Sequence, residues 1–367
     1  MISGNAPPIP CGIGDYTANL LEALLNSSDR YSPVWLSRKA RWFNSPVGHC
    51  SGIPTRKPWH KWGRRGSALT CKYLKWKSPS LVHLQEEFFS YMEGDASLRL
   101  ARKADCPLVV TLHAYHLDPK IEQQTKEVLD RADRVICSDQ RTANRLLEGT
   151  GRQADLVGWC SSPVRPQVSA SEEASNAQYF GTFGFVHPGK MNFKVVHEAL
   201  THLNGKDGSI DWKIIGPMDP QGNPHHVKLL QELDDPWIDF TGRANNLNNK
   251  EFQRQLAGMT AMVLPFRNKT GSNGTAPSRS SLQIAWAFGL PVVASSPIDD
   301  EPDLIDGENC LLVDEEDPTA WRIAMERILN DRELRKNLRK GSLVAARRFG
   351  WDRLAEEHAR IYETISN

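Results

Sequence analysis

Short apolar runs alternate with amphipathic stretches along most of the chain. The apolar runs are four or five residues long and contain few polar side chains, which is typical of buried parallel strands. We expect strands at 81–84, 108–112, 134–137, 178–181, 212–215, 261–265 and 291–294. Helices are expected at 15–25, 122–131, 139–147, 193–203, 249–258, 279–288, 318–330, 331–348 and 351–365. This alternation predicts an α/β fold with parallel sheets that are covered on both faces.

A polar segment interrupts the alternation near the middle of the chain. Residues 161–176 (SSPVRPQVSASEEASN) are rich in Ser, Pro and Ala and poor in large apolar side chains, as interdomain linkers are. A chain of 367 residues is long enough for two domains of ordinary size. The domain boundaries are therefore predicted as an N-terminal domain over 1–165, a linker over 166–177, a C-terminal domain over 178–348 and a last helix over 349–367.

The composition is that of an ordinary globular protein, with 40% hydrophobic and 24% charged residues. No apolar run approaches the roughly 18 residues of a membrane span, and no signal-peptide pattern opens the chain. The seven cysteines are far apart, without any Cys-x-x-Cys or paired Cys/His spacing. We therefore expect reduced thiols, no metal site and a cytoplasmic location.

Positive charge is concentrated in one segment, although the net charge of the chain is only +1. Residues 30–77 contain twelve Lys or Arg and no Asp or Glu, so the remainder carries +1 − 12 = −11. The same segment contains five tryptophans: Trp35, Trp42, Trp59, Trp62 and Trp76. Cations interleaved with indoles suit an anionic membrane face, and they also suit a polyanionic or lipid-diphosphate acceptor.

Two other interpretations of residues 30–80 stay open. Basic and aromatic residues together also serve single-stranded nucleic acid, but no nucleic-acid module is recognisable, so no nucleic-acid partner is expected. Alternatively, the segment is a solvated basic flank whose tryptophans are partly buried in the core.

The N-terminal half contains a glycine motif and a histidine at a strand end. Gly12 and Gly14 precede the first expected helix, where the backbone can approach a ligand and free N–H groups point at an anion. A tight turn with Asp15 in the first helical turn is the alternative interpretation. His113 follows the strand at 108–112, at the carboxyl end where ligands bind in open α/β sheets.

The C-terminal half contains two motifs that suit a diphosphate. A glycine loop after the strand at 178–181 ends at Gly184 and leads to Lys190, which precedes a helix. Close backbone approach and a mobile positive charge are what a diphosphate needs, although most lysines are simply solvated. Ser280 and Ser281 lie in the first turn of another expected helix, where main-chain N–H groups can receive phosphate oxygens.

These motifs, in this order, resemble the retaining glycosyltransferases of family 4. Further matching segments are IG at 215–216, FTG at 240–242, VLPF at 263–266, GLPVV at 289–293 and IDGEN at 305–309. The resemblance implies a GT-B fold, in which two Rossmann-like domains have parallel sheets facing across a cleft. The tail 350–362 is similar to the last helix of that family, which crosses back onto the N-terminal domain.

The resemblance implies transfer of a sugar, with retention, from a nucleotide-sugar donor to a hydroxyl acceptor. The acceptor would be a glycan or a lipid-linked saccharide of polysaccharide biosynthesis. The basic, tryptophan-rich segment at 30–80 is what would place the protein peripherally on the inner membrane face. No cofactor is expected, because the nucleotide-sugar is a substrate. No metal or protein nucleophile is expected either, because leaving phosphate oxygen takes the acceptor proton.

The resemblance also assigns roles by position. The expected catalytic residues are His113, Lys190 and Arg279. The expected donor-binding residues are Gly12, Gly14, Gly184, Gly242, Arg243, Ser280, Ser281 and Leu282. The expected acceptor-binding residues are Asp15, Tyr16, Glu86 and Glu87.

The sequence departs from the family pattern at the donor site. The two glutamates that the family carries eight residues apart are replaced by Ala276 and Ile284, and the arginine expected six residues before Lys190 is Gly184. Arg279 is expected to supply the missing positive charge. A non-catalytic GT-B protein that binds a nucleotide or glycan is therefore an alternative. A sugar-nucleotide epimerase would need more carboxylates or histidines in the cleft.

Overall fold

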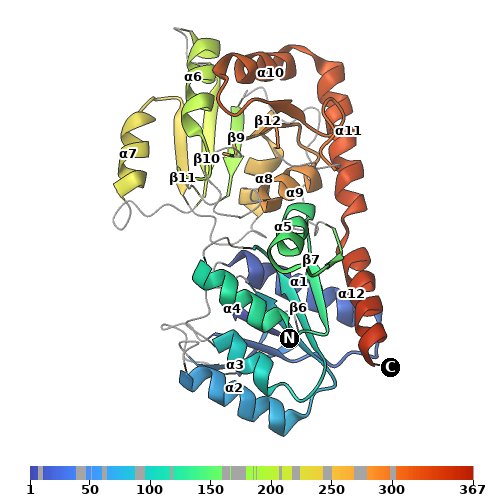
Figure 1. The fold of residues 1–367 in the computed structure, drawn as a ribbon. Helices are drawn as coiled ribbons and strands as arrows, with labels where there is room; N and C mark the ends of the chain where they lie inside the picture. Colours follow the sequence, from blue (N-terminus) through green and yellow to red (C-terminus); the bar gives the residue numbers. More distant parts are fainter. Residues whose placement is uncertain are drawn as a thin grey trace. The chain divides into compact units, whose positions relative to one another are not determined.

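The computed structural model describes two compact units. One takes in Met1–Cys160 and Phe349–Asn367, and the other takes in Ser161–Ser272 and Pro277–Arg348. Figure 1 shows the helices and strands of both. The described residues are 1–6, 11–38, 47–50, 52–59, 64–86, 96–115, 119–158, 166, 179–184, 186, 188–205, 209–216, 224–242, 250–267, 279–297 and 303–366. The predicted linker at 166–177 lies outside them, apart from Pro166.

The strands described in the first unit form an eight-stranded sheet. They are β1 (Ile2–Asn5), β2 (Trp35–Arg38), β3 (Val47–Cys50), β4 (Ile53–Trp59), β5 (Val82–Glu86), β6 (Leu108–Leu112), β7 (Arg134–Cys137) and β8 (Asp155–Leu156). Their order is β3-β4-β2-β1-β5-β6-β7-β8, parallel except where β3 pairs with β4. The order reverses between β1 and β5, so the carboxyl ends of these two strands flank the place where open sheets bind ligands.

Helices cover both faces of this sheet. They are α1 (Gly12–Ser27), α2 (Arg64–Lys77), α3 (Ala96–Lys103), α4 (Pro119–Leu129), α5 (Gln140–Thr150) and α12 (Trp351–Ser366). Alternate residues of β6 pack on opposite sides: Val110 shares a core with Val128 of α4, and Val109 shares another with Leu354 of α12. Because both faces are covered, every residue of β5 and β6 is buried.

The strands described in the second unit form a six-stranded sheet in which all pairs are parallel. They are β9 (Tyr179–Phe183), β10 (Asp211–Ile215), β11 (Ile238–Gly242), β12 (Ala261–Leu264), β13 (Val292–Ser295) and β14 (Leu311–Val313). The order β11-β10-β9-β12-β13-β14 is that of the dinucleotide-binding Rossmann fold, with its reversal between β9 and β12. Its helices are α6 (Phe193–Asn204), α7 (Pro224–Glu232), α8 (Lys250–Ala257), α9 (Arg279–Ala287), α10 (Pro318–Asn330) and α11 (Arg332–Arg348).

The two parallel-sheet, Rossmann-like units confirm the predicted fold class. All seven predicted strands are present with ends shifted by at most two residues, and all nine predicted helices with ends shifted by at most three. The expected ranges do not include β1, β2, β3, β4, β8, β11, β14, α2, α3 and α7. Cys11, Cys71, Cys106, Cys137 and Cys310 are free thiols. None of the helices in the described ranges has the length and apolarity to cross a membrane.

Candidate functional site

Three segments of the second unit meet where β9 and β10 end. Gly184 directly follows β9 with φ of 133°, and its N–H donates to the Ile215 carbonyl at 3.1 Å. A Cβ placed on Gly184 would lie 2.6 Å from Ser281 Oγ in the first turn of α9. A Cβ placed on Gly216 would lie 1.7 Å from the Gly184 carbonyl oxygen. We call this meeting of Gly184, Gly216 and Ser281 the glycine corner; only glycine fits at the first two positions.

The glycine corner has donors suited to a phosphate group. The first four N–H groups of an α-helix have no intrahelical acceptor, and they form the positive end of the helix dipole. Ser281 adds a hydroxyl, 1% exposed as a residue, whose Oγ has no hydrogen-bond partner among the residues that the structure describes. A hydroxyl among the N–H groups of a helix start is an arrangement that binds anions.

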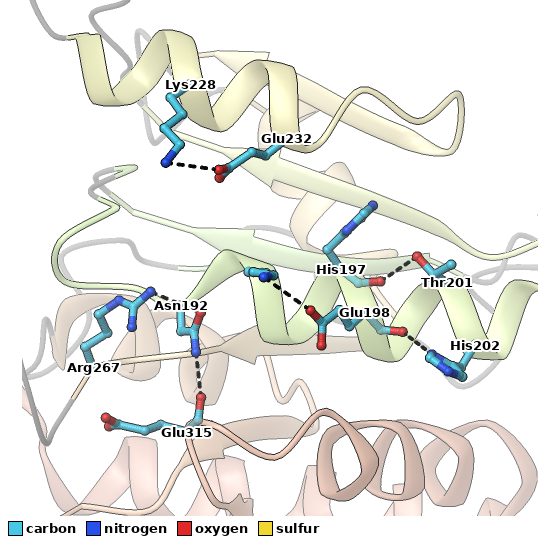
Figure 2. A network of polar contacts seen from close by, with 10 residues as sticks. Asn192, His197, Glu198, Thr201, His202, Lys228, Glu232, Arg267 and Glu315 are labelled. Atoms are coloured by element: carbon cyan, nitrogen blue, oxygen red, sulfur yellow. Dashed lines mark hydrogen bonds and ion pairs between the residues drawn. The ribbon is translucent and has the colours of Figure 1, made fainter.

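The main chain around Lys190 is anchored, whereas the Lys190 side chain is exposed. Lys190 O accepts from the Arg267 N–H at 2.8 Å, and the Arg267 guanidinium donates to Pro188 O at 3.3 Å and to Asn192 Oδ1 at 3.1 Å. Asn192 Nδ2 in turn donates to Glu315 O at 2.9 Å, as Figure 2 shows. The loop is therefore held on both sides of Lys190, while the Lys190 side chain stays exposed to solvent.

The role of Arg267 was not predicted from the sequence. The available signal was its position, three residues after β12, which is one of the two strands that flank the reversal of the sheet. An arginine beside a lysine loop at that place is a candidate for holding the loop. Nothing in the sequence alone reveals which carbonyl groups it contacts.

The other residues predicted to bind the donor are distributed more widely. Arg279 and Ser280 begin α9, and Leu282 is 3% exposed, so its side chain belongs to the core. Gly242 ends β11, which is an edge strand separated from β9 by β10. Arg243 and Ala276 lie outside the described residues. Ile284 is 1% exposed, so the position counted for the second family glutamate faces the core of the second unit.

His113 occupies the predicted place at the carboxyl end of β6 in the first unit. The main-chain N–H of His113 donates to Glu86 O at 2.9 Å, and its ring Nε2 lies 2.8 Å from Gln85 Oε1. The Tyr16 ring meets the imidazole edge-on, with 4.9 Å between the ring centres. Burial lowers the pKa of His113 to about 3, with a smaller contribution from His358. Because an amide oxygen only accepts, Nε2 of the neutral ring carries the proton and Nδ1 is the acceptor.

Hydrogen bonds continue from His113 into the core of the first unit. His83 Nε2 accepts from the Thr111 hydroxyl at 2.7 Å and from the Gln85 amide at 3.2 Å, and its Nδ1–H donates to Tyr362 Oη at 2.6 Å. Burial lowers the pKa of His83 well below its ordinary value, and it lowers that of His358 to about 4. We call His83, His113 and His358 the histidine network. It links β5 and β6 to α12 through neutral imidazoles.

Several predictions for the N-terminal half need correction. Gly12 and Gly14 were expected to precede the first helix, but α1 begins at Gly12, so both glycines lie in its first turn. Glu86 is 0% exposed, because every position of β5 is buried, and its carboxylate accepts from the Ser97 hydroxyl. The carboxylate therefore does not line a surface. Tyr16 is 6% exposed, Asp15 is partly exposed, and Glu87 lies outside the described residues.

Replacing Gly216 by alanine is expected to lower the free energy of unfolding of the second unit by about 2 kcal/mol. The added Cβ would meet the Gly184 carbonyl oxygen, a main-chain atom that cannot turn aside as a flexible side chain does. Urea denaturation measures the change. Gly12→Ala is the matched control, because a Cβ there has nothing within 4 Å. Equal stability of the two variants would contradict the close approach at the glycine corner.

Comparison of the sequence with known proteins gives matches among glycosyltransferases. Residues 177–331 match the family model described as Glycosyl transferases group 1. A D-inositol 3-phosphate glycosyltransferase of a Nocardioides species is 25% identical over 208 residues, which are 55% of this chain but only 44% of that enzyme. An uncharacterized glycosyltransferase of Methanocaldococcus jannaschii is 22% identical over 291 residues, 78% of this chain and 76% of the relative. The first match thus spans less than half of the relative's length.

Solved structures resemble the whole chain. Sucrose-phosphate synthase from Thermosynechococcus elongatus aligns with a TM-score of 0.78 at 18% identity, covering 99% of this chain and 97% of that one. HepE from Anabaena, in complex with UDP-glucose, aligns with a TM-score of 0.72 at 15% identity and 99% coverage of both chains. At these identities the similarity shows the fold, which is that of the GT-B glycosyltransferases.

Proposed function

We propose, starting from this GT-B fold, that the chain transfers a sugar from a nucleoside-diphosphate sugar to a hydroxyl acceptor. The observation that carries the proposal is the glycine corner, where the loop after β9 lies against the start of α9 without an intervening side chain. A diphosphate placed there meets helix N–H groups and the Ser281 hydroxyl. Lys190, on its anchored loop, is the cation that reaches the same group.

Negative charge develops on the diphosphate as the bond to the sugar breaks. Donors already in place stabilise this charge more effectively than donors that must reorganise, and this is a large term in such reactions. In the first unit, His113 is neutral because of its burial, so its Nδ1 offers a hydrogen-bond acceptor to a hydroxyl group and contributes no positive charge.

We further propose that transfer occurs with retention and without a metal ion. The acceptor hydroxyl attacks the sugar on the face that the diphosphate leaves. The hydroxyl proton passes to an oxygen of the leaving diphosphate, so no protein nucleophile forms a bond. Lys190, with Arg279 at the start of α9, supplies the positive charge that a metal ion would otherwise supply. Turnover measured with and without EDTA tests metal independence, and the anomeric configuration of the product tests retention.

UDP is the first nucleotide to test, because HepE is described in complex with UDP-glucose and matches the whole chain. Binding to the folded state alone stabilises a protein by about 2.7 kcal/mol when the ligand is at 100 times its Kd. We expect UDP, GDP, ADP or dTDP to raise the melting temperature and the matching nucleoside to leave it unchanged. If none of the four has an effect at millimolar concentration, the proposed diphosphate site is wrong.

A non-catalytic binding protein is the second candidate, favoured by one observation. Ile284 is 1% exposed, so no carboxylate projects from this position of α9 to hold the ribose. A protein of that kind would bind a nucleoside diphosphate without consuming its sugar conjugate. Release of free nucleoside diphosphate from a panel of nucleotide-sugars distinguishes it from an enzyme.

A further inference from the structure

The basic segment at 30–77 does not form one surface. Trp35 in β2 is 0% exposed, and its Nε1 donates to Ser3 Oγ at 2.7 Å. Trp76 on α2 is 70% exposed. Trp42 and Trp62 lie outside the described residues. Part of the segment therefore builds the sheet of the first unit, and α2 is its described part with an exposed indole.

Helix α2 has a buried face and a cationic face. Gly66, Ser67 and Thr70 are buried on the side that packs against α3 and β4. The exposed positions repeat with helical spacing. Apart from Ala68, we call them the α2 outer face: Arg65, Leu69, Lys72, Lys75, Trp76 and Lys77. Leu69 is 48% exposed, so two large apolar side chains lie among four cations.

In the described part of the chain, no acidic side chain balances this face. The sequence has no Asp or Glu between residues 30 and 77. Within the described ranges, none of its four cations forms an ion pair with an acidic side chain. Lys77 Nζ lies 4.6 Å from the centre of the Trp76 ring, and the Tyr73 ring meets Trp76 edge-on at 5.6 Å. The indole is thus supported by its neighbours while it remains in solvent.

We propose that the α2 outer face binds the surface of an anionic lipid bilayer. Lysine and arginine beside exposed leucine and tryptophan suit the interface, where cations meet lipid headgroups and the indole lies at headgroup level. A single-stranded nucleic acid would use several aromatic side chains as stacking platforms, whereas the described part of this face offers one. The inference concerns the first unit alone and does not depend on the proposed transfer reaction.

Co-sedimentation of the full chain with vesicles tests the proposal. Vesicles of phosphatidylcholine with about 30% phosphatidylglycerol are expected to bind the protein at low salt, and pure phosphatidylcholine vesicles are not. Binding should fall at high salt, because screening shortens the reach of the charges. Failure to sediment with the anionic vesicles at about 50 mM salt overturns the proposal.

Two charge-matched double variants locate the surface. Lys72→Ser/Lys75→Ser is expected to weaken partitioning roughly 30-fold, since each basic residue near such a surface contributes about fivefold. Lys336→Ser/Lys340→Ser removes the same charge from exposed positions of α11 and is expected to change partitioning less than twofold. Equal losses would show that net charge, and not this face, drives binding, which overturns the proposal.

Trp76→Ala tests the apolar part of the same face. It leaves every charge in place, and its side chain is exposed, so we expect a normal melting temperature with roughly tenfold weaker partitioning. Unchanged partitioning would contradict a role for the indole at the interface. Tighter binding to single-stranded DNA than to the anionic vesicles would overturn the lipid assignment in favour of nucleic acid.

Discussion

Acidification from about pH 7 to about pH 5.5 is expected to lower the free energy of unfolding of the first unit by about 3 kcal/mol. The folded-state pKa values are depressed at all three members of the histidine network, to about 3 at His113 and about 4 at His358. The unfolded chain binds protons near pH 6.5 and the folded chain does not. Stability is therefore complete above pH 6.5 and is lost as the pH falls towards the folded values.

Urea denaturation at the two pH values measures this loss. His358→Gln removes one titrating ring and is expected to reduce the difference by about 1 kcal/mol, whatever it does to stability at pH 7. His202→Gln is the control, because His202 is exposed on α6 in the other unit. Equal stability of the unmodified protein at both pH values would contradict a network of neutral histidines.

Replacing Lys190 by alanine is expected to raise the Kd for a nucleoside diphosphate about 30-fold and to lower kcat/KM about 100-fold. A charge-assisted hydrogen bond contributes roughly 1.5–3 kcal/mol, and its contribution grows when charge develops on the leaving group. Because the side chain is exposed, the melting temperature without ligand should not change. Calorimetric titration and the release of free nucleoside diphosphate provide the two measurements.

Lys194→Ala is the matched control for that experiment. Lys194 lies four residues further on and is 76% exposed, and among the described residues its ion pair is an exposed one with Glu198 at 3.7 Å. Its replacement removes the same charge from the same region and is expected to leave both constants within twofold. Equal effects of the two substitutions would show that general electrostatic attraction, and not a specific contact of Lys190, is at work.

The most apolar strands of both sheets could be predicted from the sequence, and the shorter or more polar strands could not. Strands β6 (LVVTL) and β12 (AMVL) are buried on both faces, so they are continuous apolar runs. Strand β4 (IPTRKPW) carries two prolines and two cations. It lies between the parallel β2 and the antiparallel β3. Helix α2 was not predicted for a related reason. The charge and tryptophan content of its segment were interpreted as a binding surface and not as a helix.

The donor side of the candidate site was predicted in its motifs but not in its contacts. Gly184, Lys190 and Ser281 were identified from glycines, charge and position along the chain. The sequence does not show that Gly216 touches the Gly184 carbonyl, because that contact depends on how two loops cross. Glu86 was misjudged because a carboxylate after an apolar run usually faces water, whereas here the strand continues through it.

The place of α12 has a consequence for biosynthesis. This helix is made after the whole of the second unit, yet it packs against α1 of the first unit and supplies Tyr362 and His358 to the interior between the two helices. A ribosome must therefore deliver all of the second unit before the first can close its core. The first unit, most of which is translated earlier, therefore completes its core later. Until then the apolar sides of α1 and β6 are exposed, and a chaperone would bind them.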